Sequence, residues 1–207
     1  MNKNVRILTE SAIMLALASV LSMFQVYKMP LGGSITIASL LPIIIIAYRH
    51  GIKWGFVTAF AHSVLQLVIF GGLENIAYGT TMEARLAIIF VDYIIAFTAL
   101  GTAAFFANIV KSNKKTARTI NFSLGAVVAL VIKFICHWLV GAVVWYGLTK
   151  DIWYADNTEH FVHKHGAWVY SFIYNIQYML PELIITVVIG VVLVNLLDFK
   201  KDRIWEK

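Results

Sequence analysis

Long apolar stretches dominate this chain and decide what it can fold into. A helix needs about 20 mostly apolar residues to cross the hydrocarbon core of a membrane, with a range of about 17–25. The sequence holds six stretches that meet or approach this length, and short polar segments separate them. They cover residues 5–26, 35–48, 54–70, 86–110, 122–148 and 168–199. The sequence therefore predicts an all-α integral membrane protein with six transmembrane helices, which form a single transmembrane domain over residues 1–207.

Composition excludes the soluble alternatives. Hydrophobic residues make up 60% of the 207 residues and charged residues only 14%, against about 45–50% and about 25% in ordinary globular domains. A soluble fold of this size could not bury so much apolar surface, which argues against a secreted domain, a nucleic-acid binder and a disordered chain. The single cysteine, Cys136, lies in an apolar stretch, so no disulfide framework is expected.

The stretch 35–48 is short for a full crossing and contains Pro42. Proline inside a helix removes a hydrogen bond and bends or breaks the helix. A kinked or partly re-entrant segment is therefore an alternative to a straight crossing here.

Basic residues predict the orientation. With the N-terminus in the cytoplasm, twelve lysines and arginines fall in the inner segments and four in the outer ones, and Lys133 lies inside a stretch. This asymmetry follows the positive-inside rule and places both termini in the cytoplasm. It also accounts for the net charge of +6 without nucleic acid.

Motifs for ATP hydrolysis and for membrane hydrolases are missing from the sequence. It contains no Gly-x-x-x-x-Gly-Lys-Ser/Thr phosphate loop, no His-Glu-x-x-His and no Gly-x-Ser-x-Gly. We therefore expect no ATP hydrolysis through a phosphate loop, and the sequence gives no indication of a membrane hydrolase.

Polar side chains interrupt the apolar stretches. A charge at the centre of a bilayer costs about 2.5–3.5 kcal/mol on insertion scales, so such residues usually face a cavity or a partner. The candidates are His62, Gln66, Asp92, Lys133, His137, Asn175, Gln177 and Glu182. For His62 we favour a packing role between helices.

Depth along the helices brings several of these residues together. At about 1.5 Å per residue, Asp92 lies about 9 Å, Asn175 about 10 Å and His137 about 16 Å from the outer ends of their helices. Trp145 and Tyr170 lie nearer the outer ends of their helices and offer aromatic faces to a ligand. The alternative for Trp145 is that it belongs to the belt of aromatic residues at the membrane interface. The set predicts a pocket, open to the outside, for a small cationic aromatic ligand, with Asp92 as counter-charge.

Four residues of the fifth stretch repeat at a spacing of four and lie along one helix face. They are Lys133, His137, Gly141 and Trp145. The glycine removes a side chain where a flat group could lie.

Lys133 and Glu182 both fall about 21–23 Å from the outer ends of their helices. We expect them to pair, directly or through water, as the floor of the pocket, with snorkelling of the lysine as the alternative.

Three histidines, His160, His163 and His165, lie in the outer loop 149–167. Imidazole suits zinc, but no cysteine accompanies them and the loop also holds Asp156 and Glu159. We expect a solvated loop and no metal site.

Five segments resemble a known family and cover most of the chain. They read LTESAIMLAL, MPLGGSITIASLLP, DYIIAF, KFICHWLVGAVVWYG and WVYSFIYN. On these segments the chain resembles the thiamine-specific substrate-binding subunit (S component) of energy-coupling factor (ECF) transporters. The resemblance implies the six-helix S-component fold and thiamine bound as transported substrate, with no catalysis and no cofactor.

The resemblance also implies the binding residues. They are Asp92, Tyr93, Lys133, His137, Gly141, Trp145, Tyr170 and Asn175. Asp92 stands where some family members have glutamate, which shortens the reach of the carboxylate by one methylene. Glu182 and the long outer loop with its histidines depart from the family pattern.

Partners follow from the same resemblance. In the family, the S component docks on a transmembrane coupling subunit that works with two cytoplasmic ATPase subunits. Ala12 and Ala16 form a small-x-x-x-small pair that lets another helix approach closely, and they are the expected docking surface, with internal packing as the alternative. The outer connection 27–34 is expected to act as a lid, through Tyr27, Pro30, Gly32 and Gly33.

Three other functions remain open at this point, of which a membrane enzyme using the outer histidines would need a catalytic constellation that the sequence does not offer. The same pocket chemistry would serve another small heterocyclic vitamin. A stand-alone proton-coupled transporter would use Asp92, Glu182 and Lys133 as a proton relay, although no inverted repeat is evident in the sequence.

Overall fold

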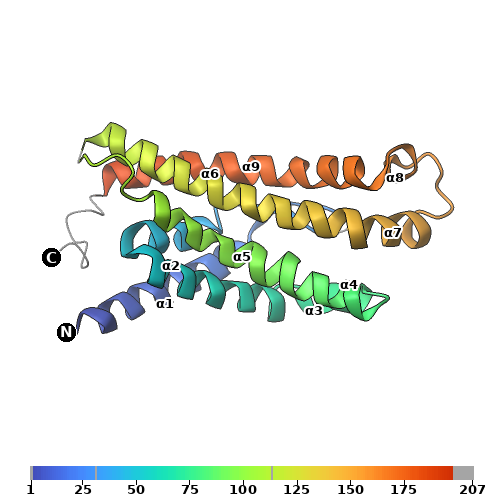
Figure 1. Cartoon of the computed structure of the whole chain (residues 1–207), viewed down its shortest axis with the longest axis horizontal. Coiled ribbons are helices and arrows are strands. Elements are labelled where there is room, and N and C mark those ends of the chain that lie inside the picture. Colours follow the sequence, from blue (N-terminus) through green and yellow to red (C-terminus); the bar gives the residue numbers. More distant parts are fainter. Residues whose placement is uncertain (1, 31, 113, 198–207) are drawn as a thin grey trace.

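Helices form nearly all the regular structure of this protein, as the apolar stretches predict. The computed structural model describes residues 2–30, 32–112 and 114–197. Its helices run along one long axis (Figure 1). The α-helices are α1 (Lys3–Met23), α2 (Leu41–Val68), α3 (Gly72–Tyr78), α4 (Met82–Ala87), α5 (Ala96–Thr98), α6 (Lys115–Val140), α7 (Tyr146–Leu148), α8 (Phe161–Lys164) and α9 (Ala167–Leu196).

Segments with other helical pitches join several of these helices into longer rods. The π-helical segment η1 (Ile88–Ile95) and the 3₁₀ segment η2 (Ala99–Phe106) continue α4 and α5. The π-helical segments η3 (Gly141–Trp145) and η4 (Thr149–Trp153) continue α6 and α7. Much of the loop that the sequence predicted after residue 148 is therefore helical.

Within the described residues, four helical rods are long and apolar enough to cross a membrane. They are Lys3–Met23, Met82–Phe106, Lys115–Trp153 and Ala167–Leu196. The pair of α2 and α3, bent by 60°, makes a fifth if it is counted as one span. The predicted count of six crossings goes beyond this test and stays a prediction.

A sharp bend at Gly51 divides α2. The glycine has φ 81° and ψ −171°, a conformation that residues with a side chain rarely adopt. A Cβ on Gly55 would lie 2.8 Å from the Cα of Ala47, whereas residues eight apart in a straight helix are separated by about 12 Å. The chain therefore folds back at Gly51, and two arms of α2 take the place of the predicted segments 35–48 and 54–70. Pro42 lies in the first turn of α2, where proline is tolerated, so the break falls at the glycine and not at the proline.

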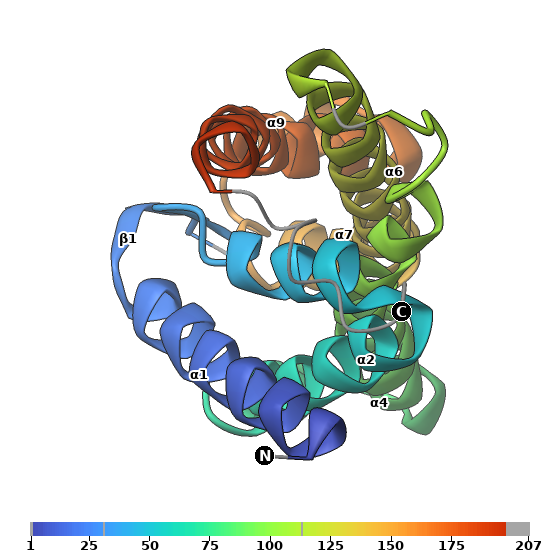
Figure 2. The same ribbon diagram turned by 90° about the vertical axis from the view of Figure 1, so that its left-hand side faces the viewer.

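The first arm of α2 lies inside the bundle. Every residue from Leu41 to Tyr48 is buried, and Ile43 and Ile44 belong to one apolar cluster with Phe122 of α6 and residues of the other rods. Figure 2 shows this arm between α1 and α9. A helix that is apolar all round is stable in a protein core or in a membrane, and this arm is enclosed by the other helices.

Apolar side chains also cover the outside of the bundle. On α9, Leu180, Ile184, Val188 and Val192 recur every four residues and are each about half exposed, between 47% and 57%. A continuous exposed apolar stripe of this kind is unfavourable in water and suits contact with lipid tails. The outer surface thus agrees with a protein that resides in a membrane.

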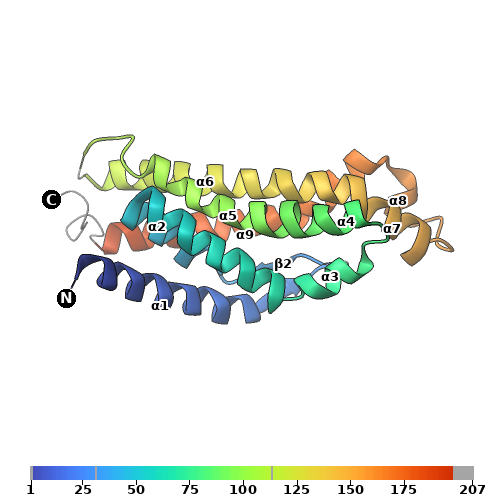
Figure 3. The same cartoon turned by 60° about the horizontal axis from the view of Figure 1, so that its bottom comes forward.

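A short antiparallel hairpin follows α1. Strands β1 (Gln25–Lys28) and β2 (Ser34–Thr36) replace the predicted end of the first helix and the predicted start of the second. The hairpin lies against one side of the bundle, where β2 contacts α1 and α9 (Figure 3).

A charged cluster ties α1 to the bend in α2 at the end of the molecule where α1 begins and α9 ends (Figure 1). The Glu10 carboxylate accepts hydrogen bonds from Arg6 Nε at 3.2 Å and His50 Nε2 at 2.7 Å, and pairs with Arg49 Nε at 3.2 Å. Because Arg49 and His50 immediately precede Gly51, this cluster holds the fold-back of α2 against α1.

Candidate ligand-binding site

One cavity of about 480 Å³ collects the predicted binding residues. Its walls come from the hairpin, from α2 and α3, from η1, and from the rods that contain α6 and α9. All eight predicted ligand contacts line it: Asp92, Tyr93, Lys133, His137, Gly141, Trp145, Tyr170 and Asn175. The structure therefore brings together residues that stand up to 83 positions apart in the chain.

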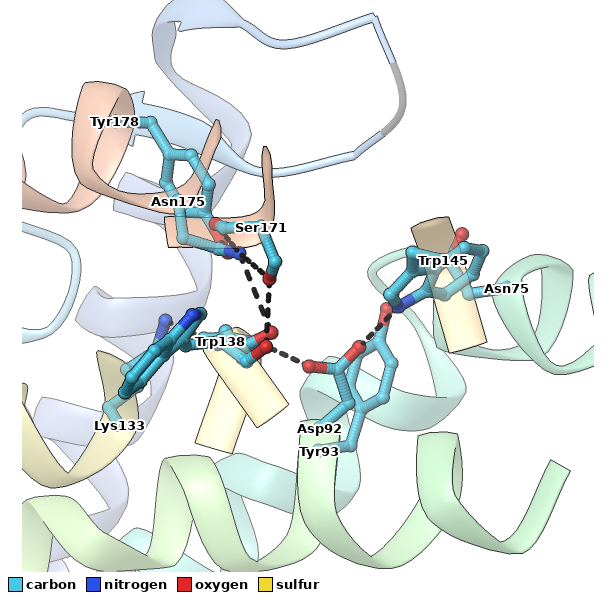
Figure 4. A network of polar contacts seen from close by, with 10 residues as sticks. Asn75, Asp92, Tyr93, Lys133, Trp138, Trp145, Ser171, Asn175 and Tyr178 are labelled. Carbon is cyan, nitrogen blue, oxygen red and sulfur yellow. Dashed lines mark hydrogen bonds and ion pairs between the residues drawn. The ribbon is translucent and has the colours of Figure 1, made fainter. Parts of the chain in front are cut away.

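Asp92 is the centre of a polar chain inside this cavity. His137 Nδ1 donates to Asp92 Oδ1 at 2.5 Å, and Trp145 Nε1 donates to Asp92 Oδ2 at 3.0 Å. The Lys133 ammonium contacts His137 Nε2 at 2.9 Å. Figure 4 shows the carboxylate reached from two sides. The chain runs from a cation through an imidazole to a carboxylate, which is why three such groups are tolerated inside an apolar bundle.

These contacts leave the carboxylate able to accept more hydrogen bonds. With Nδ1 of His137 as donor to Asp92, Nε2 is the acceptor for the lysine, so the imidazole is neutral. A carboxylate has about four acceptor positions, and His137 and Trp145 use two of them. A ligand donor or a cation can therefore reach Asp92 without displacing either residue.

Aromatic rings line the cavity around this chain. Tyr93 and Phe97 stack with ring centres 6.1 Å apart, and Trp145 and Trp153 stack at 6.3 Å with an angle of 17° between their planes. Asn75 Nδ2 donates to the Tyr93 hydroxyl at 2.6 Å and fixes that ring from α3. The cavity thus offers flat apolar faces beside one carboxylate.

Asp92, Gly141 and Trp145 all lie in π-helical segments, η1 and η3. Such segments insert an extra residue into a turn and often mark functional sites. Sequence periodicity did not reveal them, because the apolar pattern of a π-helical turn differs little from that of the surrounding α-helix.

Gly141 has a second role that the sequence did not show. A Cβ at this position would overlap the Oγ of Ser171 and lie 3.1 Å from Asn175 Nδ2. The glycine therefore lets α9 approach the rod that contains α6, in addition to lining the cavity. The predicted free space for a flat group above Gly141 is instead filled by α9.

Residues of the hairpin line one side of the cavity, and the action of the connection 27–34 as a lid stays a prediction. Pro30, Gly32 and Gly33 line it, and Gly33, with φ +89°, packs directly on the Tyr178 ring, which a Cβ would meet at 2.7 Å. Tyr27 does not line this cavity; it is 54% exposed and lines a second cavity that shares Pro30, Tyr170 and Tyr174 with the first.

Glu182 holds the hairpin and does not contact Lys133 directly. Thr36 donates its backbone N–H to Glu182 Oε2 at 2.7 Å and its hydroxyl to Glu182 Oε1 at 2.6 Å. Between these two described residues the structure has no ion pair or hydrogen bond, so the predicted direct pair with Lys133 is not formed, although both line the cavity. A bridge through water stays a prediction.

Several lining residues were missed from the sequence. Tyr174 and Tyr178 of α9 line the cavity. Tyr174 donates to Gly32 O at 2.9 Å, and Tyr178 donates to Asn175 Oδ1 at 2.6 Å. Tyr170, Tyr174 and Tyr178 follow one another at intervals of four, a signal that could have revealed them, because residues four apart share a helix face.

Four further residues named from the sequence have different surroundings: His62, Gln66, Ala12 and Ala16. The His62 side chain is fully buried with its ring edge-on to Phe97 at 5.6 Å, which agrees with packing, whereas Gln66 lines the cavity and donates to Ser22 Oγ at 3.0 Å. Ala12 and Ala16 are exposed on α1, so internal packing does not account for them.

The outer histidines hold their own loop together. His163 Nε2 contacts Tyr154 O at 2.7 Å, His165 Nδ1 contacts Phe161 O at 3.2 Å, and the His160 ring stacks on Tyr154 at 3.6 Å. One nitrogen of each ring is thus engaged by a backbone group of this segment, including Val162 N–H, which donates to His160 Nδ1 at 3.2 Å.

Comparison with known proteins shows which family this chain belongs to. The model of the thiamine transporter protein family (Thia_YuaJ) matches residues 8–201. A curated relative, the thiamine transporter ThiT of Bacillus subtilis (strain 168), is 30% identical over 188 residues, covering 88% of this chain and 86% of the relative. ThiT of Lacticaseibacillus paracasei is 28% identical over 159 residues, covering 74% and 70%.

Two solved structures share the fold. ThiT from Listeria monocytogenes superposes with a TM-score of 0.71 at 22% identity, covering 94% of this chain and 96% of that one. The S component for biotin from an ECF-type ABC transporter superposes at 0.53 with 20% identity, covering 96% and 94%. The family match spans most of the sequence, so this chain belongs to the thiamine transporter protein family and is a membrane transport protein, not an enzyme.

Proposed function

We propose that this protein binds thiamine on the outside of the cell membrane, as the substrate-specific S component of an ECF-type ABC transporter. Partner subunits supply ATP hydrolysis, and the chain needs no cofactor of its own. Thiamine is the transported substrate.

The observation that carries this proposal is the position of Asp92 among aromatic rings in a cavity of about 480 Å³. Thiamine has a flat thiazolium ring with a permanent positive charge and an aminopyrimidine with hydrogen-bonding groups along one edge. Cation–π stacking on a desolvated ring such as Trp145 contributes about 2 kcal/mol. The unused acceptor positions of Asp92 suit either the thiazolium charge or the exocyclic amine.

We further propose six crossings with both termini in the cytoplasm. The first residues of α1 and the last described residues of α9 lie at one end of the molecule (Figure 1), as an even number of crossings requires. The arms of α2 that meet at Gly51 supply the second and third crossings, and basic residues Arg49 and Lys53 flank that turn. The excess of positive charge then lies on the cytoplasmic side.

The docking surface for the coupling subunit is the exposed face of α1. Ala12 and Ala16 are accessible there, and small residues permit another helix to approach closely in a membrane. The other partners in this proposal are the two cytoplasmic ATPase subunits of the ECF module, and lipid surrounds the remaining faces.

Uptake of labelled thiamine tests the proposal as a whole. Cells that lack their own thiamine uptake are supplied with this chain, with the ECF module, or with both. The proposal is supported if uptake occurs only when this chain and the ECF module are both present. That uptake should also be insensitive to a protonophore while the ATP level is held constant. Uptake by this chain alone that a protonophore abolishes would instead establish a proton-coupled transporter. Binding of biotin or another heterocycle in place of thiamine by the purified protein would establish a different S component.

A further inference from the structure

A second cavity lies beside the first and has its own aromatic walls. It measures about 240 Å³. Its described lining consists of Tyr27, Met29, Pro30, Tyr154, His160, Phe161, Tyr170, Tyr174 and Gln177. Pro30, Tyr170 and Tyr174 line both cavities, so the two spaces share a wall made by the hairpin and α9.

The rings of this outer cavity come from three different parts of the chain. Tyr27 comes from β1, Tyr154 and Phe161 from the outer loop and α8, and Tyr170 and Tyr174 from α9. Phe161 and Tyr170 lie 5.3 Å apart between ring centres, and Tyr170 and Tyr174 lie 5.9 Å apart. These contacts join the loop to the same tyrosines that border the main cavity.

The second cavity has no charged side chain among its described lining residues, so only its aromatic faces can attract a cation. Among the described lining residues there is no aspartate, glutamate, lysine or arginine. Burial and the neighbouring His163 lower the pKa of His160 below its usual range, so this imidazole is neutral at pH 7 and does not repel a cation. Its ring is held flat against Tyr154.

We infer that this outer aromatic cavity is a second, low-affinity binding site for flat organic cations, which captures thiamine before it passes to the Asp92 cavity. The inference rests on the proposed function only for the identity of that cation. Aromatic faces attract a cation within about 6 Å of the ring centre, more weakly at exposed than at desolvated sites. Without a carboxylate the site binds weakly, which suits a ligand that must move on. The shared wall of Tyr170 and Tyr174 gives that ligand a continuous aromatic surface.

The first test uses a probe that does not depend on thiamine recognition. The probe is the 3-methylthiazolium cation, with neutral thiazole as its control, and its contact with purified protein is followed by saturation-transfer difference NMR. The main cavity is disabled by Asp92→Asn combined with Trp145→Leu. Residual saturation of the cation, and not of thiazole, is expected in this background. Tyr154→Leu should abolish it, whereas Tyr154→Phe, which keeps the ring, should retain it.

Two outcomes of this test would overturn the inference: no residual signal in the disabled background, or a residual signal equal in Tyr154→Leu and Tyr154→Phe. If Tyr154→Leu does not fold, the pair Tyr27→Leu and Tyr27→Phe makes the same comparison on the exposed hairpin residue. Since the probe contains no pyrimidine, the result stands whether or not the protein proves specific for thiamine.

The second test measures capture directly. Stopped-flow fluorescence follows the association of thiamine with the otherwise unmodified protein. Tyr154→Leu removes one partly exposed ring, so it should slow association by about two- to fivefold and leave the dissociation rate unchanged. Tyr154→Phe keeps the ring and should associate at the wild-type rate. An unchanged association rate would contradict capture at this site. If the folded wild-type protein does not bind thiamine, the proposed function is contradicted. The experiment with the 3-methylthiazolium probe would then still show whether the outer aromatic cavity binds cations.

Discussion

The indole Nε1 of Trp145 donates a hydrogen bond to Oδ2 of Asp92 at 3.0 Å, joining two side chains that stand 53 positions apart. The bond fixes the edge of the indole against the carboxylate and leaves the ring face to line the cavity beside Trp153. One residue thus orients the carboxylate and also presents an aromatic surface next to it.

These two contributions of Trp145 can be separated by substitution. Trp145→Phe keeps an aromatic face and loses the N–H donor, whereas Trp145→Leu loses both. We expect Trp145→Leu to weaken thiamine binding by about 30-fold, which corresponds to the loss of about 2 kcal/mol of cation–π stacking, and Trp145→Phe to weaken it less. Isothermal titration calorimetry checks this without relying on the fluorescence of the residue removed. Equal losses in both variants would show that the face of the ring contributes nothing.

Close approach of α9 at Gly141 predicts a packing defect. In Gly141→Ala, the new methyl group overlaps the Oγ of Ser171, and overpacking of this kind typically costs about 1–3 kcal/mol. We expect a lower Tm in detergent and weaker thiamine binding. The double variant Gly141→Ala, Ser171→Ala removes the overlapping oxygen and should recover part of the Tm. No recovery in the double variant would argue that Gly141 matters for a reason other than contact with α9.

The contact between Thr36 and Glu182 predicts how firmly the hairpin is held. Thr36→Val keeps the shape of the side chain and loses the hydroxyl that donates to Glu182. A hydrogen bond to a charged group contributes about 1.5–3 kcal/mol, so hydrogen exchange of the hairpin amides and thiamine dissociation should both become about tenfold or more faster. Thr36→Ser retains the donor and serves as the control. If Thr36→Val dissociates thiamine at the wild-type rate, this contact does not hold the cavity closed.

The exposed alanines of α1 predict a separation of binding from transport. Ala16→Leu adds bulk where the coupling subunit is proposed to approach closely, so it should abolish ATP-dependent thiamine uptake. It should leave thiamine binding unchanged, because Ala16 lies on the surface and does not line the cavity. The same reasoning applies to Ala12. Leu17→Phe adds bulk at an exposed position about 100° around the helix from Ala16 and should retain uptake. Normal uptake by Ala16→Leu would exclude this face as the docking surface.

Much of the fold follows from hydrophobicity alone. Each predicted apolar stretch corresponds to a helical rod or to one arm of α2, because length and composition determine which segments can be buried or face lipid. The hairpin was not predicted, because strands of four and three residues around Pro30, Gly32 and Gly33 resemble a loop. The π-helical segments were not predicted either, since their wider turns depend on packing and not on local sequence.

The sequence predicted eight residues that line the candidate site, but it missed Tyr174 and Tyr178 and did not give the contacts between side chains. Depth along the helices placed Asp92, His137 and Trp145 in the same half of the membrane, and the structure joins them by hydrogen bonds. The same reasoning paired Lys133 with Glu182, and the direct contact is not formed, while a bridge through water stays a prediction. Rise per residue gives the position along a helix but not which neighbour a side chain faces. The nearest partner of Glu182 came from a strand that the sequence did not reveal.

Calorimetric titration of thiamine into purified wild-type protein and Asp92→Asn is the most direct test of the central claim, that Asp92 and its aromatic neighbours form the thiamine site. A charge-assisted hydrogen bond contributes about 1.5–3 kcal/mol, so we predict saturable binding by wild type that Asp92→Asn weakens by about tenfold or more. A neutral thiophene analogue of thiamine serves as the matched ligand, and its binding should fall less if Asp92 pairs with the thiazolium. Undiminished thiamine binding by Asp92→Asn, or no binding by folded wild type, would contradict the account.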